Sequence, residues 1–329
     1  MRYLVLVTDY DGTIATGGKA AESTLSAIER LRRSGRRVLL LTGRRVDDLL
    51  KVCPRVQLFD YVVAENGAVL YEPRAREETL LGKPPPNQFI ERLRELTGNS
   101  LDVGKVIIST RLPHHIAVLQ AIQEMGLEVQ IIFNKDAVMV LPAGVNKATG
   151  MDYALHKLGL SSHEAVGIGD AENDHSFLER CECAVAVANA VPAIRELAAF
   201  TTKGEAGHGV VEIVDELIAD DLSKMLGRVR KNLLSIGLAP DGMPVTVPPY
   251  GLNILIAGPS GSGKSTVTAG IVERLIEQAY QVCIVDPEGD YGTLAEVLTL
   301  GSTRYAVTVN QALAVLEDPK MNLNINLLG

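Results

Sequence analysis

Two carboxylates, Asp9 and Asp11, stand two residues apart after the apolar segment 3–7 and are followed by Gly12 and Thr13. Side chains alternate along a strand, but the alternation breaks where a strand passes into a turn, so both carboxylates can face one pocket. Such a pocket could hold a divalent cation and a nucleophile together. A turn that closes a strand is the simpler explanation of Asp-Gly alone. The whole run Asp-x-Asp-Gly-Thr favours a chemical role.

Three further polar segments lie where the sequence predicts the ends of elements. The run Thr-Gly-Arg at 42–44 follows an apolar strand, Lys147 begins a helix, and the run Gly-Asp-Ala-Glu-Asn-Asp at 169–174 follows another strand. In open parallel sheets, ligands bind outside the carboxyl ends of the strands. We therefore expect Asp9, Thr42 and Asp170 at one edge, with groups of the types needed for phosphoryl transfer.

The elements that must position these groups alternate between strand and helix. This rhythm covers 1–83 and 144–225 and predicts parallel βαβ units. The proline run at 84–86 interrupts it, and we place an inserted α+β subdomain over 84–143. The predicted strands are 3–7, 37–41, 61–63 and 165–168, and the predicted helices are 23–33, 146–158 and one after Gly209. Inside the insertion we expect helices at 87–97 and 113–125, a strand at 105–109, and a hairpin of 128–133 with 137–141.

A second constellation lies near the end of the chain. The run 258–266 reads Gly-Pro-Ser-Gly-Ser-Gly-Lys-Ser-Thr, follows an apolar strand predicted over 252–257, and opens a helix predicted to reach about residue 279. In this P-loop pattern, loop amides cradle phosphates, the lysine reaches the β and γ phosphates, and the serine hydroxyl binds Mg²⁺. The predicted nucleotide-binding residues, with ATP as a possible ligand, are Gly258, Gly261, Gly263, Lys264, Ser265 and Thr266.

The rest of this P-loop unit, 251–329, contains less than an ATPase needs. The predicted strand 281–285 ends in an acidic run, 286–291, whose simpler explanation is a proline-glycine turn. No apolar strand ending in paired acids follows, although hydrolysis needs such a carboxylate. We expect the fold to be cut off, as a fragment or a decayed domain. The proline-rich segment 226–250 is predicted to be a linker.

Composition restricts the class of protein. The chain has 329 residues with 47% hydrophobic and 22% charged content, which is ordinary for a soluble globular protein, and its length suggests two domains or one domain with an insertion. No apolar run is long enough for a bilayer and no cleavable signal pattern begins the chain, so we expect a cytoplasmic protein. The net charge of −8 disfavours broad nucleic-acid binding. Reduced thiols are expected at Cys53, Cys181, Cys183 and Cys283.

Together, the runs 9–13, 42–44 and 169–174 with Lys147 resemble the motifs of the haloacid dehalogenase (HAD) superfamily of phosphohydrolases, and they occur in family order. The resemblance covers about 1–225. An insertion between Thr42 and Lys147 is similar to the C2-type cap of the class IIB, Cof-like branch. The implied fold is a Rossmann-like α/β core with an α+β cap, followed by a partial P-loop α/β unit. Its run 286–291 resembles the DNA-pumping and conjugation ATPase class.

The resemblance implies a role for each group. Asp9 would be the nucleophile that forms an aspartyl-phosphate, and Asp11 the general acid and base. Thr42, the amide of Gly43, and Lys147 would bind phosphoryl oxygens and neutralise charge. Mg²⁺ would be held by the Asp9 carboxylate, the Asp11 carbonyl and Asp170, with Asn173 and Asp174 orienting this shell and Asp174 counted with the metal-binding set.

Substrate contacts are less defined by the sequence. Arg44 is a candidate contact or a surface residue, and Asn66 is either a candidate contact or part of a hairpin turn at 65–68. Cap candidates for the pocket are Arg111, His114, His115 and Lys135. The cap is similar in size to that of the archaeal phosphoglycolate phosphatase type, which favours a small phosphorylated acid or sugar.

The resulting hypothesis is a Mg²⁺-dependent phosphomonoesterase with an attached ATP-binding segment. One alternative is a phosphate-ligand sensor that regulates a P-loop motor. A phosphomutase is a third interpretation, and an incompletely water-excluding cap would disfavour it.

Overall fold

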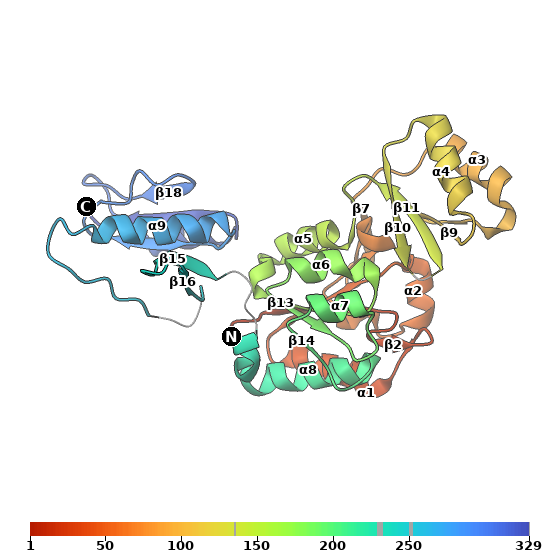
Figure 1. Ribbon diagram of the computed structural model, residues 1–329, viewed down its shortest axis with the longest axis horizontal. Coiled ribbons are helices and arrows are strands. Elements are labelled where there is room, and N and C mark those ends of the chain that lie inside the picture. Colours follow the sequence, from red (N-terminus) through yellow and green to blue (C-terminus); the bar gives the residue numbers. More distant parts are fainter. Residues whose placement is uncertain (135, 229–232, 250–252, 329) are drawn as a thin grey trace. The chain divides into compact units, whose positions relative to one another are not determined.

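The computed structural model describes the chain except for residues 135, 229–232, 250–252 and 329. It forms two compact units, Met1–Val229 and Arg230–Gly329 (Figure 1).

An eight-stranded sheet is the centre of the first unit. Two of its inner strands, Val5–Asp9 and Ala165–Gly169, are mainly apolar and buried throughout, as expected where both faces of a parallel sheet are covered. In spatial order the strands are β14 (Phe200–Thr201), β13 (Cys183–Ala186), β12 (Ala165–Gly169), β1 (Val5–Asp9), β4 (Arg37–Leu41), β5 (Tyr61–Ala64), β6 (Val69–Glu72) and β7 (Glu77–Leu80). Strands β14 to β5 pair in parallel, so β12, β1, β4 and β5 bring their carboxyl ends to one edge, called the rim below.

Helices cover both faces of this sheet. Figure 1 shows α1 and α8 together on one side, and α5 beside α6 on the other. Residues Leu25, Ile28 and Leu31 form the buried stripe of α1, and each contributes about 1.5–3 kcal/mol by leaving water. The helices are α1 (Glu22–Arg33), α2 (Val46–Val52), α5 (Lys147–Leu158), α6 (His175–Arg180), α7 (Pro192–Leu197) and α8 (Ala206–Asp220), and a small hairpin joins β2 (Ala15–Thr16) to β3 (Lys19–Ala20).

The inserted segment forms a separate four-stranded sheet, ordered β10-β11-β9-β8. Its strands are β8 (Asp102–Val103), β9 (Ile108–Arg111), β10 (Val129–Asn134) and β11 (Ala137–Pro142), and its helices are α3 (Asn87–Thr97) and α4 (His115–Met125). Phe89, Leu93 and Val118 of the helices pack against Val138 and Val140 of the sheet in a core of their own. Figure 1 shows both helices on one face of the sheet. We refer to this segment as the cap.

The predicted strand at 105–109 is displaced in the structure, where β9 begins only at Ile108. The reason is that the backbone amides of Lys105, Val106 and Ile107 all bind the carboxylate of Glu65. The predicted helix at 113–125 likewise begins later, at His115.

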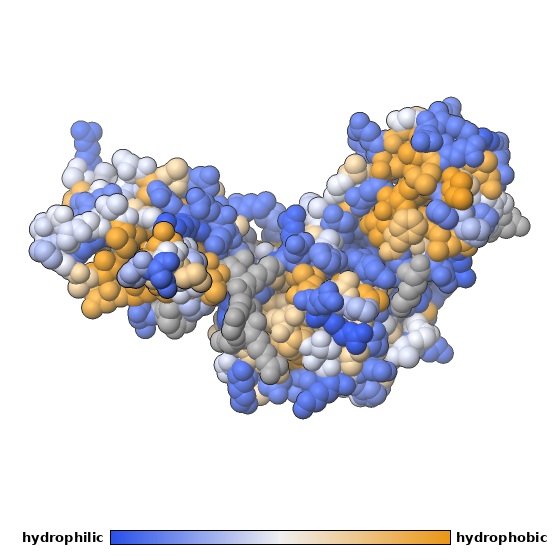
Figure 2. All heavy atoms as spheres, in the orientation of Figure 1, coloured by the Kyte–Doolittle hydropathy of each residue, from blue (hydrophilic) through white to orange (hydrophobic). Residues whose placement is uncertain are grey.

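The second unit contains a three-stranded parallel sheet, ordered β17-β19-β18, and a hairpin, β15-β16. Its elements are β15 (Leu234–Leu238), β16 (Pro244–Val247), α9 (Lys264–Glu277), β17 (Cys283–Asp286), β18 (Val297–Leu300), α10 (Val309–Leu316) and β19 (Asn322–Asn326). Apolar side chains gather on the face of this unit that Figure 2 shows.

The strand predicted over 252–257 is wrong for its described part. Residues 253–258 form no strand, and the side chains of Ile254 and Leu255 are 51% and 90% exposed. An apolar strand of a parallel sheet is stable when neighbours cover it, and the described strands of this unit leave this segment without a paired neighbour.

Two smaller predictions can be compared with the structure. Among the described residues, no helix is long and apolar enough to cross a membrane. The four cysteines are free thiols, and three of them are buried, which agrees with their predicted reduced state.

Candidate active site

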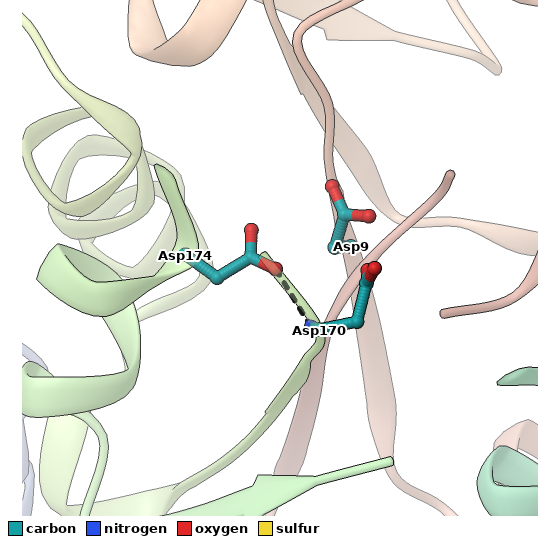
Figure 3. Close-up of side chains that lie close together, drawn as sticks. All are labelled: Asp9, Asp170 and Asp174. Atoms are coloured by element: carbon teal, nitrogen blue, oxygen red, sulfur yellow. Dashed lines mark hydrogen bonds between the residues drawn. The ribbon is translucent and has the colours of Figure 1, made fainter. Parts of the chain in front are cut away.

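Three buried aspartates meet at the rim. Asp9 ends β1, Asp170 follows β12, and Asp174 closes the short 3₁₀ helix η5 (Glu172–Asp174). Carboxylate oxygens from these residues lie within 4.8 Å of one another (Figure 3). Asp174 accepts hydrogen bonds from the amides of Asp170 and Ala171, at 2.9 and 3.0 Å, and these bonds hold the loop in place. Such a cluster of hard oxygen ligands could hold a metal ion.

Lys147 supplies the positive charge. It begins α5 behind a capping box of Asn146 and Thr149, and its ammonium lies 2.5 Å from Asp9 Oδ1 and 2.6 Å from Asp174 Oδ1. Its side chain is only 1% exposed. A buried ammonium ion is stable only when it is paired and hydrogen-bonded, and both conditions hold here.

Burial and charge act in opposite directions on these groups. Burial lowers the pKa of Lys147, but Asp174 and Asp9 outweigh it and hold that pKa above its ordinary value. Burial raises the pKa of Asp9 well above its usual range; Lys147 opposes this shift, whereas Asp174 and Asp170 add to it. A cation bound at the cluster would favour the ionised carboxylates.

Gly12 and Thr13, which follow Asp9, both lie against Asp170, and these contacts explain their residue types. Thr13 donates its hydroxyl to Asp170 Oδ1 at 2.8 Å. Gly12 has φ +91°, and a Cβ there would lie 2.3 Å from Asp170 Oδ2. The glycine therefore allows the turn after β1 to approach the Asp170 carboxylate that follows β12.

Asp11 lies apart from the three buried aspartates. Its carboxylate accepts two hydrogen bonds from Arg44, at 2.6 and 2.7 Å, and its side chain is 44% exposed. Arg44 belongs to the predicted run 42–44, in which buried Thr42 accepts the Arg44 amide through its hydroxyl at 3.1 Å. The structure thus brings Asp11 and Arg44 together as a bidentate ion pair.

Two asparagines connect the rim to the cap. Asn173 donates to Asn66 Oδ1 at 3.0 Å, and Asn66 Nδ2 lies 2.8 Å from the sulfur of Met139 on β11. A Cβ added to Gly43 would lie 3.3 Å from Asn66 Oδ1, so Gly43 faces the same group. The predicted turn at 65–68 is confirmed, since it joins the antiparallel strands β5 and β6.

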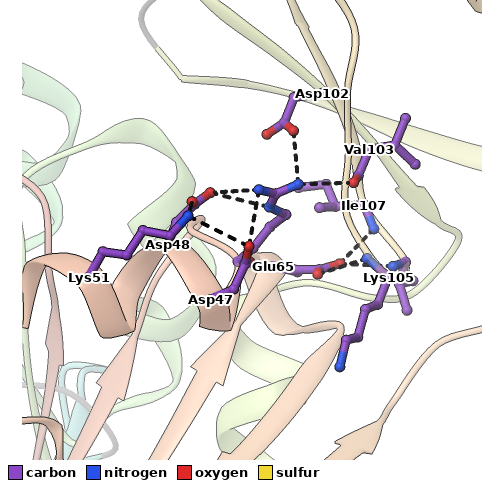
Figure 4. Close-up of polar contacts among 10 residues, drawn as sticks. Asp47, Asp48, Lys51, Glu65, Asp102, Val103, Lys105 and Ile107 are labelled. Atoms are coloured by element: carbon purple, nitrogen blue, oxygen red, sulfur yellow. Dashed lines mark hydrogen bonds and ion pairs between the residues drawn. The ribbon is translucent and has the colours of Figure 1, made fainter.

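The sequence did not predict the hydrogen bonds and ion pairs that join the core to the cap (Figure 4). Glu65 is 1% exposed and accepts the amides of Lys105, Val106 and Ile107 at 2.8–2.9 Å. Arg45 donates to Asp102 and to the carbonyl of Val103. A glutamate directly after the apolar run 61–64 is the signal that could have drawn attention to Glu65.

Two other predicted cap residues, both histidines, lie at the start of α4. His115 packs edge-on against Phe133, with ring centroids 6.4 Å apart. His114 precedes α4 as its N-cap residue. Lys135 lies outside the described residues.

The P-loop of the second unit is a loop followed by a helix. Gly261 and Gly263 have φ of +77° and +87°, and Lys264 begins α9. Lys264 donates to the carbonyl of Pro259 at 3.0 Å, and Ser265 donates to Asp290 at 2.8 Å. A Cβ on Gly258 would lie 2.6 Å from the Ser262 hydroxyl, and Thr266 is exposed.

A mainly parallel α/β sheet with a buried acidic cluster and lysine at its strand ends, and with an inserted cap, defines a Rossmann-like enzyme core with a cap. A family model described as haloacid dehalogenase-like hydrolase matches residues 6–100 and 94–214. The chain belongs to this family.

Curated relatives agree with the family. A phosphoglycolate phosphatase of Methanothermobacter thermautotrophicus is 29% identical over 217 residues, which cover 64% of this chain and 96% of the relative. Phosphoglycolate phosphatase 2 of Saccharolobus solfataricus is 24% identical, covering 67% of this chain and 95% of the relative. With the family, these relatives confirm the predicted enzyme class, a phosphoric monoester hydrolase.

Solved structures show the same fold. A haloacid dehalogenase-like hydrolase of Bacteroides thetaiotaomicron has a TM-score of 0.56 and 18% identity, covering 65% of this chain and 99% of its own. The sucrose-phosphatase of a Synechocystis species has a TM-score of 0.52 and 21% identity, covering 66% and 98%. The predicted fold class is confirmed, whereas class IIB for the cap stays a prediction.

A second family model, described as the central domain of helicase HerA, matches residues 251–328. The match supports a P-loop unit in this part of the chain.

Proposed function

We propose that the first unit hydrolyses a small phosphate monoester with Mg²⁺, through an aspartyl-phosphate on Asp9. The observation that carries this proposal is the buried Asp9 carboxylate, which lies 2.5 Å from Lys147 and beside Asp170 and Asp174. A carboxylate held in this way can act as a nucleophile while the lysine offsets its charge and that of an incoming phosphoryl group.

The residues divide the chemistry between them. An oxygen of Asp9 attacks phosphorus and the ester bond to the alcohol breaks. Asp11 in its protonated form gives its proton to the leaving alkoxide, and its carboxylate then takes a proton from the water that releases phosphate and regenerates Asp9. Thr42 and the Gly43 amide bind phosphoryl oxygens. Asp11 would leave its ion pair with Arg44 to take part in these steps.

The acidic cluster fits Mg²⁺, because three carboxylates share one lysine and offer hard oxygen donors. Asp9 and Asp170 would bind the ion, with the carbonyl of Asp11, and Asp174 would orient Lys147 and the loop after β12. When bound, the ion neutralises charge on the phosphoryl group. Asn173 and Asn66 lie beside this cluster and would contact substrate.

For the substrate we propose a phosphorylated two-carbon or three-carbon acid of the phosphoglycolate type, with a sugar phosphate as the broader class. Support comes from the names of the curated relatives, which are aligned over almost their whole length. The compact cap agrees with a small leaving group.

The test is phosphate release from phosphoglycolate by Asp9→Asn, with Asp215→Asn as the matched control. Asp215 is an exposed residue paired with Arg30 on the outer helices. We expect Asp9→Asn to lower the turnover by on the order of 10³-fold or more. Asp215→Asn should keep the turnover and the melting temperature of the wild type. Equal turnover by Asp9→Asn and the wild type would contradict the proposal. Hydrolysis in ¹⁸O-labelled water separates a phosphatase from a phosphomutase, since only hydrolysis places the label in free phosphate.

For the second unit we propose ATP binding at 258–266. Support comes from the P-loop geometry of Gly261, Gly263 and Lys264 and from the HerA match. Binding of a fluorescent ATP analogue to the whole chain, and its loss in Lys264→Ala, tests this. If the first unit hydrolyses no phosphate ester but its ligands alter nucleotide binding, a sensor that regulates the P-loop unit becomes the better account.

A further inference from the structure

We propose that Arg111 of the cap binds the carboxylate of the substrate and so selects phosphorylated acids, with Asn134 forming the other side of the same notch. This inference rests on the proposed phosphatase function and assigns the cap residues that recognise the organic part of the substrate.

The register of the cap sheet shows which of its faces is turned to the core. Met139 on β11 contacts Asn66 at the rim, and Ile132, its partner on β10, packs against the main core. On the other side of Met139, Ser109 of β9 is its register partner. Directly opposed residues of antiparallel strands lie on the same face, so Ile132, Met139 and Ser109 form one row that faces the core.

The next row on this face consists of Asn134, Ala137 and Arg111, which are opposed in the same register. Residues two apart on a strand share a face, and this row lies roughly 7 Å further along the strands than the row at Met139. Neighbouring strands lie about 4.8 Å apart, so Asn134 and Arg111 are roughly 10 Å apart across the small side chain of Ala137. The row is therefore a notch in which the polar side chains of Asn134 and Arg111 flank the small side chain of Ala137.

The side chain of Arg111 is a cation that has no ion-pair or hydrogen-bond partner among the described residues. It is exposed. Asp102 of the neighbouring strand, whose partner Ser109 is on the core-facing side, is bound by Arg45 from the core. The cations of the core rim are also engaged, since Arg44 binds Asp11 and Lys147 binds two buried aspartates. Among the described residues of the cap face toward the core, Arg111 is thus a charge that is available to an anion.

Asn134 supplies the second, independent observation. Its Oδ1 atom is shielded from solvent and has no hydrogen-bond partner in the part of the chain that the structure describes. A buried polar atom without a partner is costly, and a ligand that donates a hydrogen bond to it removes that cost. A hydroxyl or a protonated group on the substrate could serve, or the amide could turn and donate its Nδ2 to a carboxylate oxygen.

His115 of the cap is excluded from this notch by the same register. Phe133 is opposed to Val138, and Val138 belongs to the core that the cap sheet forms with α3 and α4. His115 packs against Phe133 and therefore lies on the helix side of the sheet. The face toward the active site carries an arginine and an amide, and a guanidinium matches a carboxylate through two parallel hydrogen bonds.

The experiment compares two substrates that differ in charge at the far end, phosphoglycolate and 2-hydroxyethyl phosphate, in the full chain with Mg²⁺. We expect Arg111→Ala to lower kcat/KM for phosphoglycolate by about 10–100-fold, mainly through KM, because one charge-assisted pair is lost. The value for 2-hydroxyethyl phosphate should stay within about twofold. Arg111→Lys should recover part of the loss.

Two further variants complete the design. Arg94→Ala removes an exposed arginine from α3 of the same cap and should change neither substrate. Asn134→Asp places a negative charge in the notch and should lower kcat/KM for phosphoglycolate selectively. Equal losses for both substrates in Arg111→Ala, or no loss, would overturn the inference while leaving the phosphatase intact. If the wild type hydrolyses neither ester, the proposed function and this inference fall together.

Discussion

The run after β1 and the P-loop of the second unit are both glycine-containing loops that carry charged groups, yet their surroundings differ. β1 is paired on both sides, with β12 and β4, and all five of its residues are buried. The segment before the P-loop is unpaired over 253–258, and Leu255 is 90% exposed.

This difference shows that a sequence motif depends on neighbouring elements to hold its side chains in position. At the rim, Asp9, Lys147 and Asp170 come from three separate elements, and each is held by a partner far away in the sequence. In the P-loop, Lys264 binds the carbonyl of Pro259 within its own loop. Distant contacts hold each side chain of the first group, whereas the described contact of Lys264 in the second motif is local and its neighbour Ser265 reaches Asp290.

The strongest test of the comparison removes the charge at the centre of the rim. Lys147→Ala should abolish measurable phosphatase turnover and lower the free energy of unfolding by about 3–5 kcal/mol, because buried carboxylates lose their counter-charge. Urea unfolding and phosphate release measure the two effects. Lys157→Ala, an exposed position on the same helix, is the control and should change neither. A Lys147→Ala protein as stable as the wild type would show that the rim is not held by these contacts.

The acidic cluster itself gives the next prediction. Chelation of metal ions should abolish turnover, and Mg²⁺ should raise the melting temperature of the wild type. Asp170→Asn should remove this Mg²⁺ response and, without metal, should melt a few degrees above the wild type, because one of three crowded negative charges is gone. Differential scanning calorimetry with and without Mg²⁺ measures both. A normal Mg²⁺ response in Asp170→Asn would contradict a metal site at this cluster.

A smaller effect is expected from the hydrogen bonds between Glu65 and the backbone of the cap. Glu65→Ala leaves three amides without their acceptor and should cost about 1–3 kcal/mol in unfolding free energy. Glu78→Gln removes an ion pair between the same Lys105 and an exposed strand, and should cost less than about 1 kcal/mol. Equal values for the two variants, measured by urea unfolding, would show that the buried acceptor has no special weight.

The smallest effect is predicted for the second unit. Lys264→Ala should leave phosphoglycolate turnover within about twofold of the wild type, because the described contacts of Lys264 stay within its own loop. Steady-state kinetics of phosphate release at saturating Mg²⁺ measures it. A large loss of turnover would join the two units in one activity and so break the comparison.

The sequence predicted those elements whose ends carry strong local signals. The strand 37–41 and the helix 87–97 have the predicted bounds in the structure, since Gly35 and the proline run mark where they begin. The strand ends also predicted that Asp9, Thr42 and Asp170 would lie at one edge of the sheet, and the family resemblance placed Lys147 beside Asp9. Periodicity failed at 252–257, because an apolar run does not reveal whether a neighbouring strand is there to cover it.

Pairings between side chains could not be read from the sequence. Nothing in the spacing of Asp11 and Arg44 shows that they form two hydrogen bonds, and the contact of Asn66 with Asn173 joins residues 107 positions apart. The delayed start of β9 has the same origin, because it depends on Glu65, a residue outside the insertion. Such contacts arise from tertiary packing rather than from local propensity.

Glu65 and Asn66 are consecutive in the chain and contact the cap at different segments. Glu65 holds the backbone at the entrance to β9 of the cap, while Asn66 touches Asn173 beside the acidic cluster. Both have positive φ, at +51° and +53°, so this short turn has little freedom to absorb a displacement. We therefore expect a displacement of the cap segment held by Glu65 to reach Asn173 through the single peptide bond between Glu65 and Asn66.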